Sequence, residues 1–404
     1  MKYFSINPIY TVIDIGTTKI CAIISEKRGN EIKILGIGQS PSYGLEKGIV
    51  YDIDLTSKSI KEAIEEAQAQ AQIFIESVIV GISGTHIKSY FSQGMISISQ
   101  TGITEKTIYE ATMAAQSIAL PDDEKIIHTL PTNYTIDGIH QIKNPLGMHG
   151  FRLEVTIHIM TANKHAIANI IESCRKSLLK VTDIVLEPIA SATAVLNQEE
   201  KELGALLIDI GGGTSDIVLY KNNTLEQLNI LNIAGNMFTK DLSICLNINK
   251  EKAEILKKEY GILCSSDNQL QNIITTSIDN LTEICFSTDL IQRILRARAE
   301  ELLTHLIFIL DNCYCGYNLP AGIILTGGGG LLKGLPELIT KHTGMRCRVG
   351  LPLIQSENHK AMHHPSFATC YGLLLYTVDQ DKRFESTIRP SLIQKFKNFI
   401  QRFI

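Results

Sequence analysis

The first eighty residues alternate between short apolar runs and polar or glycine-containing turns. Apolar runs at 10–15, 20–25 and 32–38 are separated by Gly-Thr-Thr and by Arg-Gly-Asn, a pattern typical of a three-stranded meander. Residues 55–73 instead place apolar side chains at helical spacing among many charges, which predicts a helix. A short strand at 78–82 follows and ends in Ser-Gly. This part of the chain therefore predicts a mixed α/β unit.

The pattern changes after residue 84. Residues 85–162 mix strands, loops and one helix, and we interpret them as an inserted α+β module. A helix at 163–179, a strand at 182–186 and an alanine-rich helix from Pro188 then return to the first pattern. The remaining expected elements are a mostly helical stretch (236–304), a strand (323–326) and a buried helix (367–378).

Two segments, 12–19 and 207–216, share one sequence motif. Each is an apolar strand that ends in an aspartate, Asp14 or Asp209, followed by a turn rich in glycine and threonine. Such a turn points backbone N–H groups into a cleft, where they hold anions. Two copies about 195 residues apart predict two similar domains that close on one phosphate chain. A third glycine-rich turn, 327–330, also follows a strand and lets the backbone approach a base and ribose closely.

The composition excludes several classes of protein. Hydrophobic residues make up 44% and charged residues 20% of the 404 residues, and this length fits roughly two to four domains. The net charge of −4 gives no basic field, so we expect no nucleic-acid partner. Nine scattered cysteines without a Cys-x-x-Cys motif indicate free thiols in a reducing compartment. We find no signal-peptide pattern and no apolar run near ~18 residues, the length that predicts a membrane span.

Residues 390–404 predict an amphipathic helix with a basic polar face, and no acidic residue follows Glu385. The alternative is a helix that packs in the protein core. The polar linker before it and the absence of acidic residues instead favour a helix that binds an anionic membrane surface. Full burial of the seven large apolar side chains would give a free energy of membrane binding on the order of 10–20 kcal/mol at most. Partial insertion and the cost of folding the helix lower this value, so we expect reversible binding. The residues expected at the membrane are Leu392, Ile393, Lys395, Phe396, Lys397, Phe399, Ile400, Arg402, Phe403 and Ile404.

These motifs resemble the phosphate-1, connect-1, phosphate-2, adenosine and connect-2 motifs of the actin, Hsp70 and sugar-kinase superfamily. Within it, the chain resembles the FtsA family of actin-like bacterial cell division proteins over nearly its whole length. Segments 48–52, 150–154 and 234–241 carry this resemblance together with the two phosphate-type turns. The most discriminating segment is 142–148, with Asn-Pro-Leu-Gly-Met, because it lies in the inserted module and outside the shared ATPase core.

The resemblance implies an α/β, actin-like (ribonuclease H-like) fold with duplicated ATPase domains around a nucleotide cleft. It adds an inserted α+β subdomain and a C-terminal amphipathic helix. The implied subdomains are 1A (1–84, 163–198 and 355–384), 1C (85–162), 2A (199–225 and 305–354) and 2B (226–304), with a linker and membrane-targeting helix at 385–404.

The resemblance also implies a site for ATP or ADP with Mg²⁺ and at most weak ATPase activity. Asp14 and Asp209 would hold Mg²⁺ through its water shell, because Mg²⁺ keeps most of its waters. Glu187 would position the attacking water, although a carboxylate is also favoured at any helix N-terminus. Glu254 and Lys257 would clamp ribose and base; a solvated surface pair is the alternative. The other residues expected to bind the nucleotide are Gly16, Thr17, Thr18, Lys19, Gly211, Gly212, Gly213, Thr214, Asp216, Gly235, Gly327, Gly328 and Gly329.

On this resemblance we expect a polymer-forming protein that tethers the FtsZ ring to the cytoplasmic face of the cell membrane at the septum and recruits later division proteins. The FtsZ C-terminal tail would dock on 226–304, and 85–162 would support self-association. A PilM-like type IV pilus adaptor is one alternative, disfavoured by the basic amphipathic helix and the Asn-Pro-x-Gly-Met segment. A sugar kinase is another, for which we find no sugar pocket with a base aspartate.

Overall fold

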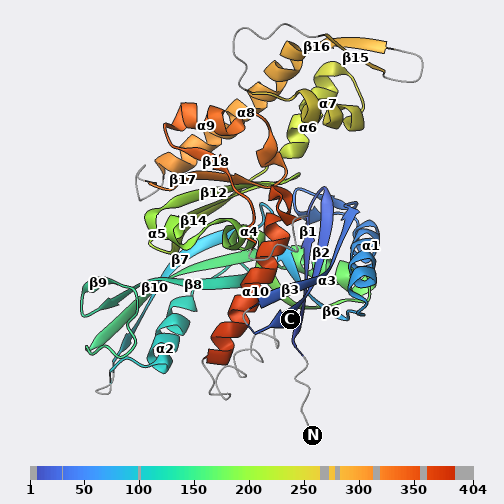
Figure 1. The fold of residues 1–404 in the computed structure, drawn as a ribbon. Coiled ribbons are helices and arrows are strands. Elements are labelled where there is room, and N and C mark those ends of the chain that lie inside the picture. Colours follow the sequence, from blue (N-terminus) through green and yellow to red (C-terminus); the bar gives the residue numbers. More distant parts are fainter. Residues whose placement is uncertain are drawn as a thin grey trace.

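The computed structural model contains three larger β-sheets with helices packed against them (Figure 1). Two of the sheets belong to related halves, and the third belongs to an insert between strands of the first half. The amphipathic helix expected within 390–404 lies outside the described residues. The structure describes residues 7–29, 31–98, 102–263, 273–277, 283–312, 319–354 and 362–386.

The first half is a five-stranded sheet in the order β11-β6-β1-β2-β3. Strand β1 runs antiparallel to β2 and parallel to β6, and its residues from Tyr10 to Ile15 are buried. The elements of this half are β1 (Ile9–Ile15), β2 (Lys19–Arg28), β3 (Glu31–Pro41), the short hairpin β4 (Leu45–Glu46) and β5 (Ile49–Val50), α1 (Ile53–Ala71), β6 (Ser77–Ile82), α3 (Lys164–Lys176), β11 (Lys180–Leu186) and α4 (Glu187–Val195).

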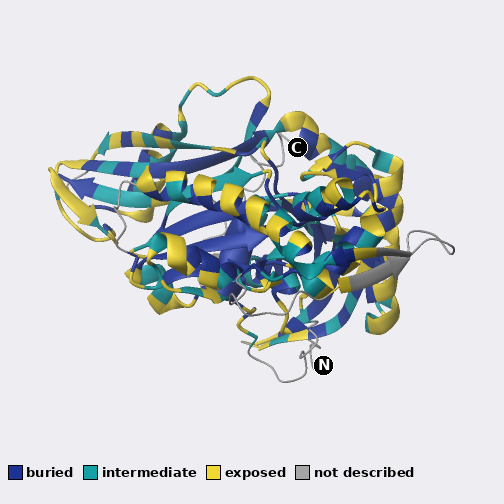
Figure 2. Ribbon diagram, turned by 90° about the horizontal axis from the view of Figure 1, so that it is seen from above, coloured by how far each residue is buried: buried dark blue, intermediate teal, exposed yellow. Residues whose placement is uncertain are grey.

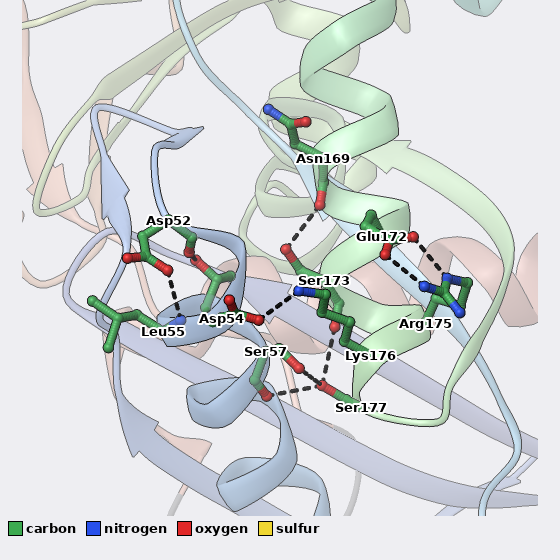
Figure 3. Close-up of polar contacts among 11 residues, drawn as sticks. Asp52, Asp54, Leu55, Ser57, Asn169, Glu172, Ser173, Arg175, Lys176 and Ser177 are labelled. Carbon is green, nitrogen blue, oxygen red and sulfur yellow. Dashed lines mark hydrogen bonds and ion pairs between the residues drawn. The ribbon is translucent and has the colours of Figure 1, made fainter.

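Helices α1 and α3 are joined by a small polar cluster (Figure 3). The side chain of Lys176 lies 2.5 Å from Asp54, and the hydroxyl of Ser177 donates to the backbone carbonyl of Ser57 at 2.8 Å. Both serines are buried, so the hydrogen bond satisfies groups that water does not reach. The insert lies between β6 and α3 in sequence, and this cluster fixes α3 back against the half that the chain left.

The second half repeats the first. Its sheet has the order β14-β13-β12-β17-β18, with β12 antiparallel to β13 and parallel to β17. Strand β12 therefore corresponds to β1 and ends in Asp209 and Ile210, as β1 ends in Asp14 and Ile15. The two similar domains expected from the two turns are confirmed. Its elements are α5 (Gln198–Leu203), β12 (Ala205–Ile210), β13 (Ser215–Lys221), β14 (Thr224–Leu231), β17 (Gly322–Thr326), the 3-10 turn Gly329–Leu331, α9 (Leu335–Thr343) and β18 (Cys347–Val349).

The insert is an antiparallel sheet, β7-β10-β8-β9, with one helix and a small core of its own. Two contacts join it to the second half: His158 Nδ1 lies 3.1 Å from the carbonyl oxygen of Leu225, and Lys143 donates to Glu202 at 2.7 Å. The insert also contacts the first half, because His128 Nε2 accepts the backbone N–H of Leu186 at 3.1 Å. Its elements are β7 (Lys88–Ser97), α2 (Glu105–Gln116), β8 (Glu124–Ile136), β9 (Ile139–Ile142) and β10 (Arg152–Asn163).

The stretch expected to be mostly helical also contains a β-hairpin. Helices α6 (Gly235–Leu246), α7 (Lys250–Tyr260) and α8 (Thr288–Asp311) form the bulk of it, but β15 (Ile273–Ser277) pairs with β16 (Glu283–Ser287). Strand β15 has the sequence Ile-Ile-Thr-Thr-Ser, whose β-branched residues favour strands. That local signal outweighed the helical pattern on either side.

Helix α10 (Ala368–Ser386) is longer than the expected 367–378. The apolar run ends at Val378, but the helix continues because a polar sequence ends burial and need not end a helix. Near its start, the backbone of Gly372 touches α4: a Cβ there would lie 1.9 Å from the carbonyl oxygen of Ala190. Figure 2 shows buried strands inside and exposed positions on the outer helices. None of the described helices is long and apolar enough to cross a membrane.

Candidate functional site

A cavity of about 650 Å³ lies between the two halves, and every residue expected to bind nucleotide or water lines it. The two strand-end turns, the third glycine-rich turn and helix α7 all contribute. The expected residues that line it are Asp14, Gly16, Thr17, Thr18, Lys19, Glu187, Asp209, Gly211, Gly212, Gly213, Thr214, Asp216, Gly235, Glu254, Lys257, Gly327, Gly328 and Gly329.

The two strand-end turns have the same backbone hydrogen bond. The N–H of Gly16 donates to the carbonyl of Lys19 at 3.1 Å, and the N–H of Gly211 donates to that of Thr214 at 2.9 Å. The turns also meet, because a Cβ on Gly212 would lie 2.3 Å from Thr18 Cγ2. Only glycine fits at that contact, so the backbone of each turn faces the other across the base of the cleft.

Four of the carboxylates that line this cavity, Asp14, Glu187, Asp209 and Asp216, have a raised pKa. Burial raises the pKa of Asp14 to about 7, opposed by the charge of Lys19 and reinforced by Asp209. Burial also raises the pKa of Asp216 to about 8, with Asp209 adding to it. The pKa of Asp209 is raised by burial, and that of Glu187 is raised by burial and by the other three carboxylates. Such a cluster favours a bound cation, which would relieve the mutual repulsion.

Three hydroxyl groups that the sequence did not single out hold two of these carboxylates. Ser191 of α4 donates to Asp209, and Thr369 of α10 donates to the same oxygen, Oδ2, at 3.0 Å. Ser83 lies 2.7 and 2.8 Å from the two carboxylate oxygens of Asp216. A Ser or Thr hydroxyl carries no motif by itself, so the fold alone identifies these partners.

Glu187 lies directly over the strand β6. A Cβ on Gly81 would come within 2.9 Å of Glu187 Cγ and 3.0 Å of Oε1. Glycine at position 81 therefore leaves the room that the glutamate side chain occupies. Glu187 is also the first residue of α4. It therefore lies at a helix N-terminus, where a carboxylate is favoured, and it also lines the cleft.

Glu254 and Lys257 face the cleft and are not a solvated pair. The side chain of Lys257 is 14% exposed, and its ammonium donates to Glu254 at 2.6 Å, to Thr239 at 2.9 Å and to the carbonyl of Gly235 at 3.1 Å. Burial lowers the pKa of Lys257, opposed by the hydrogen bond to Glu254. Burial alone would raise the pKa of Glu254, but the hydrogen bonds from Lys257 and Thr239 outweigh it and hold that pKa below its usual range. The pair is therefore fixed toward the turn that starts α6.

The third glycine-rich turn closes the opposite wall. Gly327 has φ +76°, and a Cβ there would lie 2.3 Å from Asp209 Oδ1, so it packs against the end of β12. Gly328 has nothing within 4 Å of its Cβ position and opens toward the cavity. Gly327 therefore anchors the turn against β12, and Gly328 has no side chain to block the space beside it. A backbone surface without side chains can pack against the face of a planar ring.

The described residues contain no group of three His, Cys, Asp or Glu side chains placed to hold a metal ion directly. The carboxylates surround the cavity without converging on one point. This arrangement suits a cation that keeps its water shell, as Mg²⁺ does, better than a Zn²⁺ site with tetrahedral protein ligands.

Two family models match the chain. One, described as Cell division protein FtsA, matches residues 206–372, and the other, described as the SHS2 domain inserted in FTSA, matches residues 84–161. The first model covers the second half and its cleft residues, and the second covers the insert.

Relatives match over most of their length. The cell division protein FtsA of Pseudomonas aeruginosa is 36% identical over 368 residues, covering 90% of this chain and 88% of the relative. The FtsA of Neisseria meningitidis serogroup B is 35% identical, covering 90% and 89%. The FtsA of Escherichia coli K12 is 29% identical, covering 96% and 95%.

Solved structures share the fold. A chain of the PilM-PilN type IV pilus biogenesis complex has a TM-score of 0.66 at 20% identity, covering 91% of this chain and 98% of that one. MreB5 of Spiroplasma citri bound to AMPPNP has a TM-score of 0.58 at 14% identity, covering 94% and 99%. At these identities the likeness concerns the fold alone.

Proposed function

The chain belongs to the FtsA family of cell division proteins, and we propose that it is an ATP-binding adaptor that tethers the FtsZ ring to the cytoplasmic membrane. One observation carries the nucleotide part of the proposal. Two matching phosphate-type turns and a third glycine-rich turn line a single cavity of about 650 Å³. That volume lies within the range of small-molecule sites.

In this proposal the backbone N–H groups of both strand-end turns hold the phosphates, and Gly327 to Gly329 flank the adenosine. The polar pair Glu254 and Lys257 faces the ribose side. Hydrogen-bonding groups fixed before the ligand arrives lose little entropy on binding, and Lys257 already has three partners. The AMPPNP bound to MreB5, which shares this fold, agrees with a nucleotide in the cleft.

The residues present fit Mg²⁺ with the nucleotide. Asp14 and Asp209 are each 8% exposed, and their raised pKa values mark a site that favours added positive charge. Bound Mg²⁺ would neutralise the phosphate charge and orient the phosphate chain. Glu187 would position a water molecule, but burial and the neighbouring carboxylates raise its pKa, which disfavours the charged form that a general base needs. We therefore propose weak hydrolysis at most.

The proposed division of labour follows the subdomain boundaries expected from the sequence. Subdomains 1A and 2A hold the nucleotide, 1C (85–162) supports self-association into filaments and recruitment of later division proteins, and 2B (226–304) receives the FtsZ tail. Residues 392–404 would lie on the anionic membrane surface at the septum.

A groove of about 460 Å³ between α6 and α8 is the place we propose for the FtsZ tail. Arg298 forms its wall through two hydrogen bonds to Asp241, at 2.6 and 2.9 Å, which makes that wall rigid. Arg293 is largely exposed at the groove beside the apolar Leu290 and Ile294, and it pairs with Asp289 at 2.9 Å. Asp241 and Glu301 also line the groove, and both pair with Arg298, so Arg293 is the arginine that a peptide carboxylate would reach. A groove with these groups suits an extended peptide with an acidic and several apolar side chains.

The proposal is tested with an immobilised FtsZ C-terminal peptide and the full chain. We expect the wild type to be captured, Arg293→Glu to lose most binding, and Arg296→Glu to bind normally, because Arg296 is on the same helix but does not line the groove. No capture of the wild type would contradict the FtsZ adaptor and favour a pilus adaptor.

Liposome co-sedimentation tests the membrane part separately. We expect the full chain to pellet with vesicles that contain anionic lipid and a 1–386 truncation, which keeps all of α10, to remain in the supernatant. Equal pelleting of the two proteins would contradict the proposed role of residues 392–404. A phosphatidylcholine-only vesicle serves as the control for the electrostatic contribution.

A further inference from the structure

The start of α10 forms part of the cleft wall. The side chain of Lys19 donates to the backbone carbonyl of Ser366 at 2.8 Å, and its ammonium lies 4.3 Å from the centroid of the Phe367 ring. One turn further on, Thr369 donates to Asp209 at 3.0 Å and lies 3.1 Å from the hydroxyl of Ser191. Three residues of this short segment, 366, 367 and 369, therefore contact a charged group from each half of the molecule.

These two charged groups are the ones that a phosphate chain with its cation would redirect. The ammonium of Lys19 is held by a carbonyl dipole and a ring face, both weaker partners than a phosphate oxygen. Asp209 is held by hydroxyl groups that compete with the water shell of a cation for the same oxygen, Oδ2. A ligand in the cleft would draw both groups toward itself and away from α10.

Helix α10 is continuous and packs closely on α4, so a change in the contacts at its start can affect the rest of the helix. Gly372 packs its backbone directly on the backbone of Ala190 in α4, so the helix cannot slide there without moving α4. Figure 1 shows α10 as one continuous helix that leaves the region of α4 and runs along the first half. It ends at Ser386, and five residues separate it from Leu392, the first residue we propose for the membrane.

We propose that residues 366–369 couple the occupancy of the cleft to α10 and so to the chain that follows it. In the ligand-free state, Lys19 holds the 3-10 turn Pro365–Phe367 that leads into α10, and Asp209 holds the first turn of α10 through Thr369. Ligand binding releases both contacts and loosens the helix. This inference rests on the proposed nucleotide binding and adds a direction: occupancy weakens the hold on α10.

Hydrogen–deuterium exchange of the full chain tests the coupling, with Mg²⁺ and ADP as the probe. We expect the amides of residues 370–380 in the wild type to exchange about fivefold faster with the probe, the lower end of ordinary coupling between sites. In Thr369→Val, exchange should already be fast without the probe, and the further change should fall below about twofold.

Two variants serve as matched controls. Thr369→Ser keeps the hydroxyl and should behave as the wild type. Thr377→Val removes a hydroxyl from the same helix, one that donates to the Leu373 carbonyl at 2.7 Å and does not line the cleft, and should also respond as the wild type.

The nucleotide affinity is measured in the same samples by titration with a fluorescent ADP analogue. Saturated wild type whose α10 exchange is unchanged or slower would overturn the coupling and leave nucleotide binding intact. A wild-type response in Thr369→Val would overturn it as well. Failure of the wild type to bind the analogue would overturn the proposed nucleotide function, and the coupling with it.

Discussion

The hydroxyl oxygen of Ser83 lies 2.8 and 2.7 Å from the two carboxylate oxygens of Asp216, and this contact joins the two halves of the molecule across the cleft. Ser83 follows strand β6 of the first half, and Asp216 belongs to strand β13 of the second. Both residues are buried. A hydrogen bond between buried groups is sensitive to the loss of either partner, because water does not replace it.

We expect Ser83→Ala to destabilise the ligand-free protein by about 1–3 kcal/mol, because Asp216 loses a buried donor. The change should also raise the pKa of Asp216 further, since the Ser83 hydroxyl is one of the groups that lower it. Chemical unfolding in urea at neutral pH measures the effect. Ser83→Thr retains the hydroxyl and should lose much less stability; equal losses would show that the hydrogen bond is not the cause.

We expect Asp209→Asn to weaken binding of Mg²⁺–ADP by at least about tenfold, or ~1.4 kcal/mol, because it removes a charge that faces the cation. The same change should not lower the stability of the ligand-free protein at neutral pH, since it also removes repulsion with Asp216. Isothermal titration calorimetry measures the affinity. Asp122→Asn, at an exposed position outside the cleft, is the control, and matching affinities for both variants would contradict the assignment.

The stability of the wild type should fall below about pH 6.5 relative to His128→Gln, because of a partly buried histidine that is held in its neutral form. His128 Nε2 accepts the backbone N–H of Leu186 at 3.1 Å, so that nitrogen must stay unprotonated, and burial lowers the pKa of His128 to about 4. A lowered pKa gives stability that is complete above 6.5 and is lost as the pH falls toward 4.

The loss should approach about 1.4 kcal/mol per pH unit in that window. Urea unfolding of both proteins at pH 5.0 and 7.5 measures it, and the comparison cancels the carboxylates common to the two. A stability difference that does not change with pH would contradict the neutral state of His128 in the folded protein.

We expect Gly372→Ala to destabilise the protein, although alanine is favoured over glycine in an isolated helix by about 1 kcal/mol. The new Cβ would lie 1.9 Å from the carbonyl oxygen of Ala190, so α10 and α4 must separate, which typically costs about 1–3 kcal/mol. Thermal unfolding decides the sign. Gly330→Ala, whose Cβ meets Leu325 at an ordinary 3.5 Å, is the comparison, and a higher melting temperature for Gly372→Ala would contradict the close packing.

Much of the cleft was visible in the sequence because its parts are local. A strand, an aspartate and a glycine-rich turn occupy consecutive positions, so the motifs around Asp14 and Asp209 could be recognised directly. The hairpin β15–β16 was missed because a five-residue strand competes with long helical patterns on both sides. The apolar pattern predicts an end of α10 at Val378, which is wrong because the helix continues to Ser386 after its apolar residues end.

The amino-acid sequence by itself determined the duplicated strand-and-turn motif, the insert between its two copies and the basic amphipathic pattern at 390–404. Each of these is set by residue types at short spacing, where local geometry decides. Only the tertiary structure decided that Ser83, Ser191 and Thr369 hold the cleft carboxylates, and that Glu254 and Lys257 face the cavity. Those pairings join residues far apart in the chain, and their energies depend on burial, which the packing of the two halves creates.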